Sequence, residues 1–207
     1  MRRRLYTEHK YVSFRLSEFS RFVATADFTQ DTEVAEVKRQ FEGIKALMLR
    51  HAEHENNSIH PLLAAKGSSV FRRLELDHTH HATVFAQLDT LLDATMGHDF
   101  CLVFLRFEAD NLVHQDFEET QLLPELYRLY TDAEILAQVD GPVYAAMMTV
   151  LFPHFNRLDR QGMLNDIRLA QPEKFLQAWE QISPMLEKSE QANFADTFGL
   201  PSMEQVV

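Results

Sequence analysis

A short pattern occurs twice in this chain, 63 positions apart. Each copy has a histidine, a glutamate four positions later, an aliphatic residue eight later and a proline ten later: His51, Glu55, Ile59 and Pro61, then His114, Glu118, Leu122 and Pro124. Residues four apart on an α-helix lie on nearly the same face. Each copy therefore predicts a helix that presents one imidazole and one carboxylate together, and two such helices facing each other could hold two metal ions.

The alternative is that both pairs are solvent-exposed and only support their own helices through contacts four residues apart. A single His-x-x-x-Glu pair means little, since about one is expected by chance in a chain with 10 histidines. The added aliphatic residue and proline, at the same offsets in both copies, reduce the chance of coincidence to roughly one in a thousand. The repeated pattern therefore favours a metal site.

Composition limits the class of protein. The chain has 207 residues, enough for one domain with a full core and slightly long for a bare four-helix bundle. The single Cys101 excludes an internal disulfide and a thiolate cluster, which predicts a cytoplasmic protein whose metal ligands are histidine and carboxylate. A net charge of −11 disfavours nucleic acid as a partner. With neither a signal peptide nor a long apolar stretch, we expect no membrane association.

Apolar residues recur at helical spacing almost throughout, which predicts an all-α fold. Breaks at 27–31, at 66–69 and at Gly97 separate four helices with short connections, as an up-and-down four-helix bundle requires. We expect the first helix over 5–26 and the second to end near Pro61 or soon after. Asp31 or Thr32, and then Ser68 or Ser69, are the expected N-caps of the second and third helices.

Residues 1–130 should form this bundle, and 131–207 should add C-terminal helices. Helical stretches are expected over 143–158 and 172–187, which are rich in methionine, leucine and phenylalanine. So much apolar surface must be covered. Either this segment folds back on the bundle or it forms a homodimer interface, and its composition suits both.

The other two helices also offer histidines. His78 and His81 share the apolar face of the third helix, so either or both can point inward, whereas His80 lies on the opposite side. His9 lies on the apolar face of the first helix. Buried imidazoles and carboxylates are costly unless they are paired or bind a metal, so their convergence requires a cation. Imidazole and carboxylate suit iron, manganese or zinc, and two bridging carboxylates favour a pair of ions.

With Glu8-His9 and Asp77-His78 on the other two helices, the repeated pattern resembles the hemerythrin-like (HHE cation-binding) family over about residues 5–130. The resemblance implies a non-haem di-iron centre, with one histidine from each of four helices and two bridging glutamates. By position these ligands are His9, His51, Glu55, His78, His114 and Glu118, and His81 is a candidate seventh.

Three departures refine the resemblance. Oxygen-carrying hemerythrins have an aspartate five residues after the last histidine, whereas here Glu118 follows His114 by four. This chain is therefore closer to the four-histidine, two-glutamate type of bacterial iron-cluster repair proteins. We do not expect the short cysteine-bearing N-terminal domain that is typical of those proteins. His60 occupies the position before proline where the family usually has an aromatic residue.

The resemblance implies a protein that binds or senses dioxygen, nitric oxide or iron, in iron homeostasis or iron-cluster repair, and no catalytic residue is expected. The alternative is a helical interaction protein with a structural zinc or single-metal site and no redox role. A ferritin-like oxidase ranks lower, because the Glu-x-x-His pattern of that class is absent from the inward positions.

Overall fold

The computed structural model of the chain describes residues 2–132, 134–135, 151–170 and 172–200. Within these residues every regular element is a helix, which confirms the predicted all-α fold. The chain divides into two compact units, one formed by Glu8–Val139 and the other by Asp140–Val207 with Met1–Thr7. Among the described residues, no helix combines the length and the apolar character needed to cross a bilayer.

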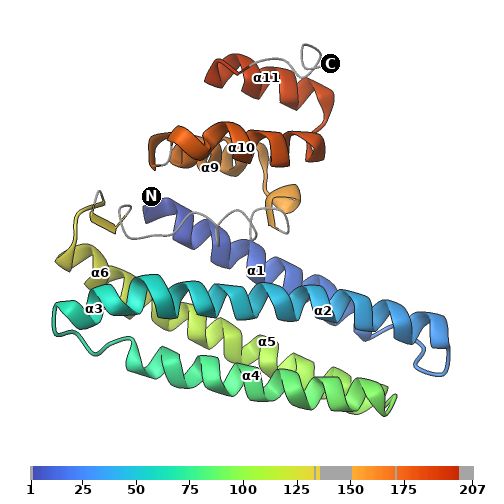
Figure 1. The fold of residues 1–207 in the computed structure, drawn as a ribbon. Coiled ribbons are helices and arrows are strands. Elements are labelled where there is room, and N and C mark those ends of the chain that lie inside the picture. The colour runs from blue at the N-terminus through green and yellow to red at the C-terminus, as the bar shows by residue number, and fades with distance from the viewer. Residues whose placement is uncertain (1, 133, 136–150, 171, 201–207) are drawn as a thin grey trace. The chain divides into compact units, whose positions relative to one another are not determined.

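Four long helices, α1 (Arg2–Val23), α2 (Asp31–His54), α4 (Arg72–Asp93) and α5 (Gly97–Phe117), form the four-helix bundle (Figure 1). One end of the bundle is filled by phenylalanine rings from all four helices. Phe19 of α1 lies edge-on to Phe104 of α5, with ring centroids 4.8 Å apart, and Phe41 of α2 lies 6.1 Å from Phe85 of α4. These rings are almost fully buried, so they fix the helices that carry the histidines at the other end.

Both copies of the repeated pattern interrupt their helices in the same way. After α2 come a π-helical turn, η1 (Glu55–Ile59), and α3 (His60–Ala65). After α5 come η2 (Glu118–Leu122) and α6 (Leu123–Leu129). The N–H of His60 donates to the carbonyl of Glu55, and that of Leu123 to the carbonyl of Glu118, a π-helical spacing in each case.

The proline of each pattern follows directly. It has no N–H with which to continue the α-helical ladder, so the helix can widen just before it. We expected the second helix to end near Pro61 or soon after, and the helical stretch ends at Ala65. The sequence did not predict that it widens at Glu55 and resumes its α-helical form at His60.

The expected breaks are present, but the expected caps are wrong. Gly67 has a φ of 76°, and the N–H of Ser68 donates to the carbonyl of Leu63 at 3.0 Å, a glycine-ended helix terminus. The N-cap positions are Gln30 for α2 and Phe71 for α4, and neither side chain makes a capping hydrogen bond.

The C-terminal unit contains helices that the sequence did not delimit. They are η3 (Phe152–His154), α9 (Arg157–Ala170), α10 (Pro172–Ile182), η4 (Ser183–Met185) and α11 (Lys188–Phe198). Residues 143–150 of the expected helix 143–158 lie outside the described residues. Its remainder is wrong, because the backbone becomes extended at Phe155 before α9 begins. The expected helix 172–187 ends at Ile182.

Candidate metal centre

Six buried side chains from the four long helices and their π-turns meet at one end of the bundle. They form two groups whose ligand atoms all lie within 4.8 Å of one another: His9, His51, Glu55 and Glu118 in the first, and Glu55, His78, His114 and Glu118 in the second. The two glutamates belong to both groups. The six side chains expected from the sequence are therefore close together in space, in an arrangement with room for two neighbouring cations.

Each glutamate turns one oxygen toward each group. Oε1 of Glu55 lies 3.2 Å from Nε2 of His51, on its own helix, and Oε2 lies 3.2 Å from Nε2 of His78 on α4. A carboxylate placed in this way can bridge two metal ions.

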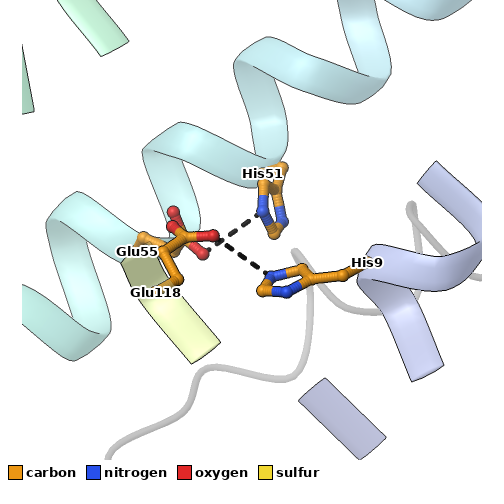
Figure 2. A group of neighbouring side chains, drawn as sticks. All are labelled: His9, His51, Glu55 and Glu118. Atoms are coloured by element: carbon orange, nitrogen blue, oxygen red, sulfur yellow. Dashed lines mark ion pairs between the residues drawn. The ribbon is translucent and has the colours of Figure 1, made fainter. Parts of the chain in front are cut away.

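Glu118 repeats the arrangement from the other helix. Its Oε1 lies 3.1 Å from Nε2 of His114, and its Oε2 lies 3.2 Å from Nε2 of His9 on α1. Figure 2 shows the first group, in which His9 and His51 point toward the two carboxylates from different helices. All four histidines thus present their Nε2 atoms to the centre.

The other ring nitrogens are oriented by polar neighbours. The Nδ1 atoms of three histidines have such a partner: Glu119 at 2.9 Å from His9, Asn56 at 3.0 Å from His78, and Asp77 at 3.3 Å from His114. A neutral imidazole that donates from Nδ1 keeps the Nε2 lone pair directed at a metal. Within the described part of the chain, Nδ1 of His51 has no hydrogen-bond partner.

Sequence analysis did not identify Asn56 and Glu119, although a signal was present. Asn56 directly follows Glu55, and Glu119 directly follows Glu118. Asn56 contacts Nδ1 of His78, whose Nε2 faces Glu55, and Glu119 contacts Nδ1 of His9, whose Nε2 faces Glu118. The polar residue after the glutamate is therefore a further shared feature of the two copies. It holds a histidine of the adjacent helix from the opposite side of the ring.

The electrostatics of the cluster favour a cation. Burial lowers the pKa of both His9 and His51 to about 4, so these rings are neutral at neutral pH, as metal ligands must be. Burial and the nearby charge of Glu55 raise the pKa of Glu118 to about 8. Burial lowers the pKa of His114, but Glu118, Glu55 and Asp77 outweigh it and raise the value to about 9. Two buried carboxylates this close repel each other, and a cation between them would remove that repulsion.

Unsatisfied atoms at the centre lead to the same conclusion. Nε2 of His78 and Nε2 of His114 are 3.3 Å apart. Once both rings are neutral, as metal ligation requires, their Nε2 lone pairs face the same space. Within the described residues, neither oxygen of Glu118 accepts a hydrogen bond of good geometry. Metal ions would satisfy these acceptors together, so the donor set fits a metal pair.

His81 lies beside the centre but outside both groups. Its ring centroid is 5.2 Å from that of His114 and 5.1 Å from that of Phe107. A pocket of about 290 Å³ lies beside His81 and His114. Its lining residues are Arg73, Asp77, His80, His81, Asp110, Val113 and His114. Burial lowers the pKa of His81 to about 4. His80 is exposed, as expected from its position opposite the apolar face of the helix.

A family model for the hemerythrin HHE cation-binding domain matches residues 1–126. The chain belongs to this family. The match confirms the resemblance inferred from the repeated pattern, and with the two histidine–glutamate groups it supports a cation-binding protein. Searches of the curated proteins and of the solved structures find no match to this hemerythrin-family chain.

Proposed function

We propose that this hemerythrin-family protein holds a non-haem di-iron centre that binds a small diatomic ligand, dioxygen or nitric oxide, as a carrier or sensor. The observation that carries the proposal is the way Glu55 and Glu118 each divide their two oxygens between two histidine pairs. A single structural zinc ion would need four ligands and no bridging carboxylate.

In this proposal His9 and His51 hold one ion, and His78 and His114 hold the other. The two glutamates bridge the ions. When bound, two ferrous ions would supply the electrons and the open coordination position that a diatomic ligand needs. Burial keeps the imidazoles of His9 and His51 neutral. Polar partners at Nδ1 orient the rings of His9, His78 and His114.

Access to the centre is proposed through the pocket lined by His81 and His114. His81 could act there as the seventh ligand inferred from the sequence, which would leave the two ions unequally coordinated. An alanine substitution at His81 that lowers the metal content would support this role, and an unchanged content would exclude it. A cytoplasmic location and a homodimer remain predictions of the sequence.

Metal analysis and an absorption spectrum of aerobically purified protein test the proposal. We expect two irons per chain and charge-transfer bands of a bridged ferric pair. His51→Ala should reduce the metal content, whereas the control His80→Ala, which removes an exposed histidine, should not. One zinc ion per chain and no visible absorption would refute the proposal in favour of the structural-zinc alternative. Two manganese ions would retain the site but change the metal.

A further inference from the structure

Asn111 is a fully buried polar residue whose side chain has no partner among the described residues. Its side chain has a relative exposure of 0%. Within the described residues, neither its amide nitrogen nor its amide oxygen makes a hydrogen bond. Burying an amide in this state is costly, and most buried polar groups in proteins are satisfied. A partner outside the chain is the direct explanation.

The position of Asn111 places it next to the metal centre. On α5 it follows Phe107 by four residues and precedes His114 by three, and all three are buried on the same face. The ring of His81, on α4, contacts the rings of both Phe107 and His114. Asn111 therefore lies at the level of His81, one helical turn from a proposed ligand of the second ion.

Gln115 is a neighbouring buried amide whose oxygen is satisfied and whose nitrogen is not. Its side-chain oxygen accepts a hydrogen bond from the hydroxyl of Ser13 at 2.7 Å, which fixes the amide group. Among the described residues its Nε2 has no acceptor. Gln115 follows Asn111 by four residues, so the two amides occupy adjacent turns. Two buried amides on adjacent turns of α5 therefore each retain an N–H donor without an acceptor among the described residues.

We propose that Asn111 is a specificity-determining residue of the small-ligand site, and that its side-chain amide donates a hydrogen bond to a ligand beside the His78–His114 pair. The inference rests on the proposed function. The carboxamide offers a donor and an acceptor but no charge. It suits a small ligand whose outer atom carries partial negative charge, such as dioxygen, nitric oxide or azide. An aliphatic residue at the same position would offer such a ligand no polar contact.

The test is an azide titration of the iron-loaded, air-oxidised protein, followed by its absorption spectrum, with thermal unfolding of the metal-free protein as a second measurement. Asn111→Leu should weaken azide binding about tenfold, equivalent to about 1.4 kcal/mol. The melting temperature of its metal-free form should stay equal or rise, because an unsatisfied amide has been removed. Asn111→Ala, which cannot overpack the site, should weaken azide binding in the same direction.

Phe104→Leu is the matched control, since Phe104 lies two turns before Asn111 on the same buried face. It should lower the melting temperature and leave the azide affinity unchanged. Wild-type azide affinity in both Asn111 variants would overturn the inference and leave the proposed function intact. A fall in the melting temperature of Asn111→Leu as large as that of the control would assign Asn111 a structural role and also overturn it. A wild-type protein that takes up no metal pair would refute the proposed function itself.

Discussion

His60 should add to the acid sensitivity of the protein, and its replacement by phenylalanine should remove that contribution. The side chain is 2% exposed, and within the described residues neither ring nitrogen has a hydrogen-bond partner. The ring stacks on Phe71 at 5.3 Å and on His78 at 5.8 Å between centroids. Burial, together with the proximity of His78 and His114, lowers the pKa of His60 to about 4, from an ordinary value of 6.5.

The direction of the pH effect follows from proton binding. Between pH 6.5 and about 4, the unfolded chain binds a proton at His60 that the folded chain does not. The free energy of unfolding therefore falls by about 1.4 kcal/mol for each pH unit in this window, and the loss levels off below the folded pKa. At pH 5.5 the loss is about 1.4 kcal/mol. Phenylalanine has no proton to bind and no nitrogen to leave unsatisfied.

The assay is urea unfolding of the wild type and His60→Phe at pH 7.5 and pH 5.5, with equal metal content confirmed in both. The substitution should raise the free energy of unfolding by about 1.4 kcal/mol more at pH 5.5 than at pH 7.5. The other buried histidines are present in both proteins, so their contributions cancel. A gain for His60→Phe that is equal at both pH values, or larger at pH 7.5, would refute the reasoning.

Four further predictions concern the shared glutamate Glu118, the neighbouring Glu119, and two glycines, Gly97 and Gly43. Glu118→Gln should release both metal ions, as metal counting would show, because one carboxylate serves both groups; loss of one ion alone would contradict the bridge. Glu119→Gln should weaken metal binding about 10- to 100-fold in a chelator competition, since it alters the partner of a ligand histidine; an unchanged affinity would contradict this. Gly97→Ala should destabilise by about 1–3 kcal/mol in urea, because a Cβ there would lie 2.3 Å from the Phe28 ring. Gly43→Ala, where a Cβ meets nothing within 4 Å, should instead stabilise by about 0.5–1 kcal/mol.

The sequence predicted the bundle and the six clustered side chains because both depend on helical period alone. A histidine and a glutamate four residues apart must share a face, whatever the details of packing. His9 and His78 could be placed because apolar residues defined the buried face of their helices. Phe71 and Gln30, by contrast, occupy N-cap positions where the sequence offered better capping residues nearby. The position at which a helix begins or ends also depends on tertiary packing, which the capping preferences of the local residues do not reflect.

The C-terminal unit was harder to predict for a related reason. Its helices are short, and they are separated by prolines inside single turns of 3-10 helix, at Pro153 and Pro184. Apolar spacing continues across such turns, so 143–158 and 172–187 each appeared as one helix. The ion pair between Arg160 and Glu190, at 2.6 Å, joins α9 and α11, two helices of this unit that the sequence did not predict.

The π-turns explain why the repeated pattern needs its proline. In each copy the π-turn begins at the bridging glutamate, and its hydrogen bond ends on the residue just before the proline. The polar residues of the site, Glu55 with Asn56 and Glu118 with Glu119, thus lie in the first turn of a widened helix. Through that turn, each pair contacts opposite nitrogens of one histidine on an adjacent helix. The spacing of ten residues from histidine to proline is therefore part of the site, because it sets where the helix widens.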